Sequence, residues 1–139
     1  MIERFSHVTL YVLDQEEAKD FYTSKLDFEV RIDFRMDNGF RWLTVSPKGQ
    51  RDTQIVLLRV DGPHVHAEVS ASMKHLLASG HLGTSLVMQT ADCRKTCEEL
   101  AAKGVQIVSP PTSHFHGVEA IIQDNSGNRF TLHEAKGVE

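Results

Sequence analysis

The sequence predicts an α+β fold of two βαβββ modules, which form a curved eight-stranded sheet around a cleft and carry their helices outside. Two observations support this prediction. Short stretches such as HVTLY at 7–11 alternate in polarity with a period of two residues, which is typical of a strand with one face in a core. The order of strands and helix in the first half of the chain then recurs in the second half.

The recurrence is visible as a nearly constant spacing between matching residues. Asp14, which precedes the first expected helix, matches Asp92, 78 positions later. Gln54 matches Thr131 at a spacing of 77. A spacing preserved over a whole strand–helix–strand–strand–strand unit indicates an internal duplication.

The first module begins with a strand and an acid-capped helix. Asp14 is a favourable N-cap, and Glu16 and Glu17 follow where the helix dipole favours acids. Apolar residues at helical spacing then predict a helix over 15–26. The Asp-Asn-Gly sequence at 37–39 predicts a hairpin turn. The strands of this module are expected at 3–13, 28–35, 40–46 and 53–60.

The second module repeats this order after a connector that holds a short helix at about 69–77. Its helix is expected at 93–104, between the N-cap Asp92 and the terminating Gly104. Pro110 and Pro111 predict the start of a loop. The strands are expected at 84–90, 105–108, 118–123 and 129–134. The predicted organisation is a single domain with a first module at 1–62, a connector at 63–82 and a second module at 83–139.

Composition excludes several classes of function. The net charge is −4 and the basic residues are scattered, so no nucleic-acid partner is expected. No apolar run approaches the roughly 20 residues that cross a bilayer, so no membrane partner is expected. The N-terminus lacks the apolar core of a signal peptide, which predicts a cytoplasmic protein. Cys93 and Cys97 share one helix face and are expected to be buried thiols.

Four stretches of the sequence carry a family resemblance, and they lie at 7–30, 40–58, 90–105 and 124–134. The most specific of them is the Asp-x-x-Gly-Asn sequence at 124–128, which a strand follows. Together they resemble the vicinal oxygen chelate superfamily, which includes glyoxalase I, bleomycin-resistance proteins and extradiol dioxygenases. The resemblance implies the fold predicted above. It does not decide the function, because members of one fold differ in chemistry.

The resemblance also implies where a metal would bind. In metal-dependent members, the first and fourth strands of each module supply one ligand each, and those positions here are His7, Gln54, Ser85 and Thr131. They offer one imidazole, one amide and two neutral hydroxyls, a poor set for a divalent cation. No metal cofactor is therefore preferred. The alternative is a divalent Ni, Zn or Fe ion, for which His7 and Gln54 are the candidate ligands.

Other side chains could supply chemistry in the cleft. Glu119 and His133 are the candidate catalytic residues, and a metal site of His7, His133 and Glu119 is conceivable. His114 and His116 are expected to be exposed loop residues. Metal-independent acid/base catalysis by His7 or His133 is a further alternative.

The expected function is binding of an amphipathic or aromatic small molecule in the cleft, as in bleomycin-resistance-type proteins with a degenerate metal site. The alternative is a metal-dependent enzyme, either a glyoxalase-like lyase or isomerase or a dioxygenase-type member. Arg41 and Trp42 are neighbours on one strand, so only one can point inward. The resemblance further implies a homodimer whose clefts combine both chains, and clefts closed within one chain are the alternative. The predicted binding residues are His7, Tyr11, Arg41, Trp42, Gln54, Ser85, Thr131 and His133.

Overall fold

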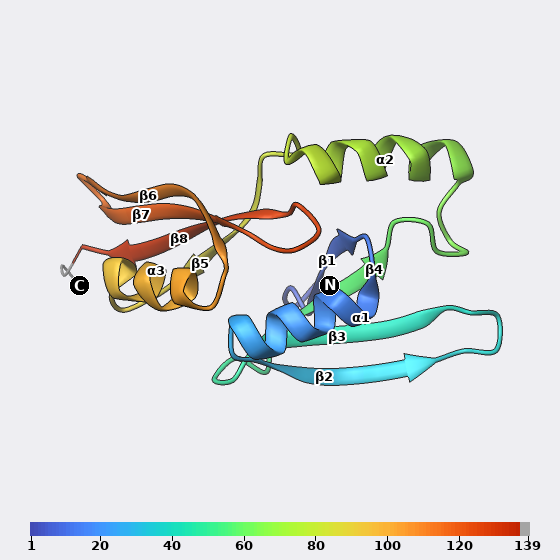
Figure 1. Ribbon diagram of the computed structural model, residues 1–139. Coiled ribbons are helices and arrows are strands. Elements are labelled where there is room, and N and C mark those ends of the chain that lie inside the picture. Colours follow the sequence, from blue (N-terminus) through green and yellow to red (C-terminus); the bar gives the residue numbers. More distant parts are fainter. Residues whose placement is uncertain (137–139) are drawn as a thin grey trace.

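The structure, a computed structural model, describes residues 1–136 and shows two βαβββ units side by side (Figure 1). The last residues of the predicted second module, 137–139, lie outside the described residues. The first unit consists of β1 (His7–Val12), α1 (Gln15–Asp20), the π-helical turn η1 (Phe21–Lys25), β2 (Phe28–Arg35), β3 (Arg41–Pro47) and β4 (Gln54–Arg59). Helix α2 (Ala67–Ser79) follows. The second unit consists of β5 (Thr84–Gln89), α3 (Cys93–Ala102), β6 (Gln106–His114), β7 (Gly117–Gln123) and β8 (Arg129–Ala135).

The two units have the same strand topology. The sheet orders are β1-β4-β3-β2 and β5-β8-β7-β6. In each sheet the first and fourth strands of the unit run parallel, and the other neighbours run antiparallel. This match confirms the α+β class and the two βαβββ modules. Within the chain the eight strands form two four-stranded sheets, and β1 and β5 each lie at a sheet edge.

The helices of both modules begin where the sequence predicts, although the first ends as an α-helix at Asp20 and continues as the π-helical turn η1. The Asp14 carboxylate accepts a hydrogen bond from the Glu17 backbone N–H at 2.9 Å. The Asp92 carboxylate accepts the equivalent bond from the Lys95 N–H at 3.0 Å. Each bond satisfies an N–H that the helix itself leaves free. No helix of the 136 described residues is long and apolar enough to cross a membrane.

Strand β6 is longer than the sequence predicts. It continues through Pro110 and Pro111 to His114, in place of the expected loop. Proline is tolerated there because β6 is an edge strand, where a missing backbone N–H need not break a ladder. The pairing of β6 with β7 is irregular on both sides of the proline pair.

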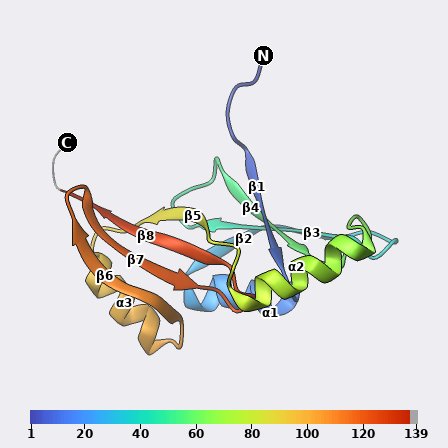
Figure 2. The same ribbon diagram turned by 90° about the horizontal axis from the view of Figure 1, so that it is seen from above.

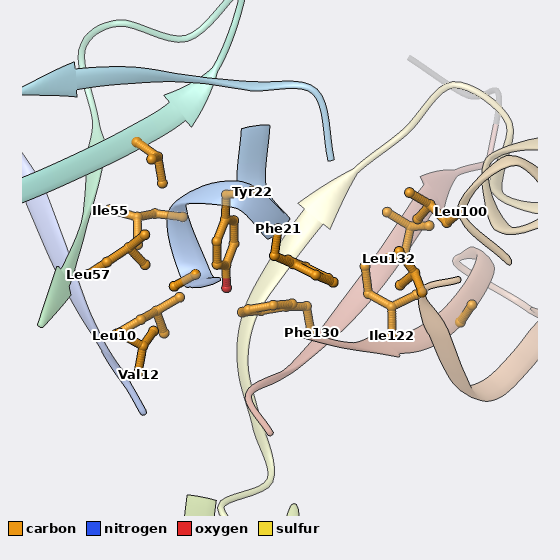
Figure 3. Packing of buried hydrophobic residues seen from close by; sticks show 14 of the residues in the cluster. Leu10, Val12, Phe21, Tyr22, Ile55, Leu57, Leu100, Ile122, Phe130 and Leu132 are labelled. Carbon is orange, nitrogen blue, oxygen red and sulfur yellow. The ribbon is translucent and has the colours of Figure 1, made fainter. Parts of the chain in front are cut away.

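The core lies between each sheet and its helix and continues from one module into the other (Figure 3). Phe21 and Tyr22 of η1 pack between the strands of the first sheet and Phe130 of the second. Alternation along the strands places these apolar side chains on the helix side and leaves the opposite face of each sheet open to other contacts. The labelled core residues of the strands are Leu10, Val12, Ile55, Leu57, Ile122, Phe130 and Leu132.

The Asp-x-x-Gly-Asn turn joins the two modules. Asp124 accepts a 2.7 Å hydrogen bond from the buried Tyr22 hydroxyl of the first module. Asn128 donates to the Tyr11 carbonyl at 2.8 Å, and Ser126 accepts from the Leu13 N–H at 2.9 Å. Burial, followed by the nearby Asp124, raises the pKa of Tyr22 well above its usual value of 10.0, so the phenol stays protonated. The Asp-x-x-Gly-Asn sequence, the most specific part of the family resemblance, therefore has a structural role: it connects the two modules.

Gly127 of the same turn cannot carry a side chain. Its φ is +111°, and a Cβ would lie 1.8 Å from the carbonyl oxygen of Leu77 in α2. The close approach of this turn to α2 thus requires glycine.

Candidate functional site

The inner face of the first sheet, opposite its helix, carries five aromatic rings that we call the aromatic wall: His7, Tyr11, Phe40, Trp42 and His64. The ring centroids of His7 and Trp42 are 5.8 Å apart, and those of Phe40 and Trp42 are 6.4 Å apart. His64 stands edge-on to Phe40 at 5.3 Å and stacks near Tyr11 at 6.5 Å. All five side chains are half-buried or exposed. The wall is therefore accessible to a ligand.

Apolar residues of β2 extend this face. Phe34 is the cross-strand partner of Trp42, and Ile32 is the partner of Thr44. Phe34 is 60% exposed and Ile32 is 41% exposed. An exposed apolar face beside a group of aromatic rings is characteristic of a binding surface.

Arg41 lies on the opposite face of the sheet from Trp42. Its guanidinium donates to both carboxylate oxygens of Asp33 at 2.8 Å and to Glu16 of α1 at 2.7 Å. Hydrogen bonds from Arg41 hold the pKa of Asp33 well below its usual 3.8. Arg41 therefore joins α1 to β2 and β3, and Trp42 is the one of this pair that faces the inner surface.

The four positions that the family resemblance marks for a metal are only partly brought together. His7 and Gln54 are register partners on β1 and β4. In the second sheet Thr131 pairs with Val87. The register of β5 and β8 shifts between Thr84 and Leu86, so Ser85 has no register partner on β8 and does not lie opposite Thr131.

The donor set at these positions does not fit a divalent cation. Among them His7 supplies one imidazole, and the amide oxygen of Gln54 accepts a 2.7 Å hydrogen bond from the Thr44 hydroxyl. The Ser85 and Thr131 hydroxyls are neutral and add no compensating charge.

The inner face of the second sheet carries a different polar group. Glu119 of β7 and His133 of β8 are register partners, and their Oε2 and Nδ1 atoms are 3.2 Å apart. His116, in the turn between β6 and β7, brings its Nε2 to 3.3 Å from Glu119 Oε1. Interaction with His116 is the main cause that lowers the pKa of Glu119 below its usual 4.5. The structure thus brings both predicted catalytic candidates together, with His116 beside them.

A groove of about 630 Å³ lies between the modules, and Val87 and Gln89 of β5 are among its lining residues. Its walls are mainly apolar and come mostly from the helix side of both sheets, for example Val8 and Ile55 on one side and Leu86 and Met88 on the other. Several of these residues pack against the core. We interpret the groove as the uncovered end of the inter-module core.

Cys93 and Cys97 are buried on α3 as free thiols, as the sequence predicts. Burial, together with the neighbouring Cys97, raises the pKa of Cys93 to about 11. A thiol in that state is a poor nucleophile and a poor metal ligand at neutral pH.

Three residues of the aromatic wall and of the Glu119 group are not among the predicted binding or catalytic residues: Phe40, His64 and His116. The sequence could have predicted Phe40, because it lies two residues before Trp42 in the expected strand at 40–46 and so shares its face. His64 belongs to the connector and His116 to a turn, and neither segment has a periodicity that assigns a face. Their positions follow only from the folded chain.

Comparisons with known proteins agree with this geometry. The model of the Glyoxalase/Bleomycin resistance protein/Dioxygenase superfamily matches residues 4–132. The crystal structure of UcmS2 is 41% identical, with a TM-score of 0.92, and the match covers 97% of this chain and 100% of that one. TnmS3, an antibiotic binding protein from Streptomyces sp. CB03234, is 30% identical with a TM-score of 0.75, covering 97% and 98%.

A relative of uncharacterized function extends the comparison to another organism. YetH of Bacillus subtilis (strain 168) is 31% identical over 134 residues, which cover 96% of this chain and 100% of YetH. Because the family model and these matches span nearly the whole chain, the chain belongs to the Glyoxalase/Bleomycin resistance protein/Dioxygenase superfamily.

Proposed function

We propose that this protein binds a planar aromatic or amphipathic small molecule, of the kind found among antibiotics, against the aromatic wall. The observation that carries the proposal is the set of five accessible rings on one sheet face. Aromatic side chains bury a large apolar area and favour stacked or edge-on contacts with another ring. A planar ligand would find such contacts with Trp42, Phe40 and His64 together.

The charge of the wall narrows the ligand class. None of the five wall residues carries a carboxylate or a guanidinium, and Arg41 and its acidic partners lie on the opposite face. Arg31, which contacts Ser46 farther along β3, is neutralised by Glu29. A cationic drug would gain little from such a surface. We therefore expect a ligand whose aromatic ring system carries no charge where it contacts the wall.

The four family metal positions offer a poor donor set for a metal ion. This also supports a protein that binds a small molecule and does not carry out the metal-dependent chemistry of the enzymatic members. The likeness to TnmS3, an antibiotic binding protein, points the same way. The enzymatic alternative would draw on His7 and Gln54, which lie side by side.

We further propose that two copies of the chain assemble, with each cleft formed by modules of both copies. Both β1 and β5 have a free edge, and Val87 of β5 is 68% exposed. The segment before β1 projects from the body (Figure 2) and carries the exposed Ile2 and Phe5. Free strand edges and exposed apolar residues are favourable for pairing with another chain.

Fluorescence titration tests the binding proposal, because Trp42 is the only tryptophan. A panel of planar aromatic antibiotics, both neutral and cationic, is added to the full-length protein. We expect saturable quenching by a neutral member. Phe40→Ala and His7→Ala should weaken binding at least about tenfold, the effect of losing a contact worth about 1.4 kcal/mol. His81→Ala, which changes an exposed histidine outside the wall, is the matched control.

Two results would contradict the proposal. One is a panel in which no member changes the Trp42 emission in a saturable way. The other is binding that Phe40→Ala and His7→Ala leave as tight as His81→Ala does.

A further inference from the structure

A cluster of metal-ligating side chains lies on the second sheet, apart from the aromatic wall. It includes none of the four family metal positions, although Thr131 lies two residues before His133 on β8. Its members are His116, Glu119 and His133, and their ligand atoms all lie within 4.8 Å of one another. We propose that this cluster binds one divalent transition-metal ion, with Zn²⁺ and Ni²⁺ as the best-matched ions. The inference does not rest on the proposed ligand, because none of the three residues belongs to the wall.

The spacing of the atoms fits a shared ion. Glu119 Oε2 lies 3.2 Å from His133 Nδ1, and Glu119 Oε1 lies 3.3 Å from His116 Nε2. Metal–ligand bonds of about 2.0–2.2 Å at tetrahedral angles place neighbouring ligand atoms about 3.4 Å apart. Small rotations of the two rings would therefore complete the site without moving the strands.

The orientation of His133 favours an ion over a simple hydrogen bond. Its Nδ1 is buried and close to Glu119, yet it has no hydrogen-bond partner among the described residues. A buried nitrogen without a partner has lost its hydrogen bond to water and gained none in return, so a partner that fills the gap is favoured. Two ligand atoms that share an ion lie close together without a hydrogen bond between them, and the 3.2 Å separation of Nδ1 and Glu119 Oε2 fits that requirement.

The backbone holds the three residues in place. Glu119 and His133 are directly opposite on adjacent antiparallel strands, so their side chains share a face. The turn that carries His116 is held by Gly117, whose φ is +137° and where a Cβ would lie 2.1 Å from the Glu134 carbonyl oxygen. His116 stacks on His133 at 5.8 Å between ring centroids. Two of the three residues thus lie on paired strands, and the third lies in the turn that joins β6 to β7.

The chemistry of the set selects the kind of ion. Two imidazoles and one carboxylate suit Zn²⁺, Ni²⁺ and related borderline ions, whereas Mg²⁺ and Ca²⁺ prefer oxygen ligands throughout. Three protein ligands also leave at least one coordination position for water or another small ligand. Side-chain exposures of 41% for His116 and 29% for Glu119 leave a path for the ion.

Calorimetric titration with Zn²⁺, and the visible absorption of Co²⁺ as a substitute ion, test the proposal. The full-length protein carries no polyhistidine tag and is first treated with a chelator. We expect one ion per chain and a Co²⁺ spectrum of low coordination number. Glu119→Gln and His133→Asn should each weaken binding at least about tenfold. His75→Ala, an exposed histidine on α2, is the matched control and should bind as the wild type does.

Of the three cluster variants, His116→Ala should disturb folding least, because the His116 side chain lies in an exposed turn. It should also weaken Zn²⁺ binding while the circular dichroism spectrum stays unchanged. The proposal is overturned if the wild type binds no Zn²⁺ at micromolar concentrations, or if the three cluster variants bind as tightly as His75→Ala. Loss of the ion in His7→Ala alone would overturn it as well and would assign the ion to the family positions.

Discussion

At the scale of single residues, Tyr22 and Asp124 show how a polar contact can be essential inside an apolar core. The Tyr22 ring packs among Phe21, Phe28 and Phe130, while its hydroxyl crosses to the other module. Asp124 accepts that hydrogen bond and three more from the backbone N–H groups of residues 126–128 in its own turn. The carboxylate is thus held by its turn, and the phenol of Tyr22 connects that turn to the first module.

Tyr22→Phe should destabilise the protein by about 1–2 kcal/mol, because the buried Asp124 Oδ2 loses the Tyr22 hydroxyl and keeps only the Asn128 amide as a donor. The measurement is chemical unfolding followed by circular dichroism. Tyr11→Phe is the matched control, since Tyr11 is half-buried on the inner face, and it should change stability by about 0.5 kcal/mol or less. Equal stability of the two variants would show that the Tyr22–Asp124 bond contributes nothing net.

At the scale of elements, helix α1 is attached to its sheet by charge as well as by apolar packing. Arg41 of β3 is buried and pairs with Asp33 of β2 and Glu16 of α1. Lys19 of α1 adds a contact to Asp33 at 3.2 Å. The ion pairs explain why a guanidinium occurs on the helix side of a sheet whose neighbours there are Leu43 and Val45.

This network predicts a pH dependence of stability. The pKa of Asp33 is lower in the folded protein than its usual 3.8, so its contribution is complete above that value and is lost as the pH falls below it. Arg41→Met should cost about 2 kcal/mol at pH 7, less than the roughly 3–5 kcal/mol of fully buried pairs, because both carboxylates are partly exposed.

The test compares the free energies of unfolding of the wild type and Arg41→Met from pH 7 down to pH 3. The difference between them should shrink below about pH 4, because Asp33 takes up a proton in the unfolded chain while it stays ionised in the folded wild type. Lys48→Met is the control, because Lys48 forms an exposed ion pair with Asp27 and should change stability little. A difference between Arg41→Met and wild type that stays constant over this range would contradict the role given to Asp33.

At the scale of the whole molecule, the two modules are joined on one side and open on the other. The Asp-x-x-Gly-Asn turn and the shared core connect them, whereas the β1 and β5 edges and both inner faces remain accessible within one chain. A second copy would cover these edges and bring another inner face opposite the aromatic wall. The proposed assembly therefore affects ligand binding as well as stability.

Val87→Glu should shift the assembly toward monomers, because it places a charge on the free edge strand β5. Light scattering after size-exclusion chromatography measures the mass. Val69→Glu is the matched control, since Val69 is an exposed apolar residue of α2 away from both edges. A wild-type protein that elutes as a monomer, or a Val87→Glu variant that keeps the wild-type mass, would exclude assembly through this edge.

The sequence predicts much of the fold and less of the candidate site. Asp14 and Asp92 cap their helices as predicted, because a cap is a local contact between a side chain and the next turn. The loop expected from Pro110 was wrong, since the tolerance for proline depends on whether a strand lies at an edge. His116 was expected in an exposed loop, and its approach to Glu119 depends on a turn whose geometry only the folded chain has.

The sequence by itself determined most of the elements, their duplication and the family, because these depend on residue spacing and on contacts between near neighbours. The tertiary structure decided which side chains meet: Trp42 inward with Arg41 outward, and Thr131 beside Val87 with Ser85 out of line. The physical reason is that strands alternate with a period of two, so a bulge or a shift in register changes which residues share a face and which are neighbours. Those shifts depend on pairing between segments far apart in the chain.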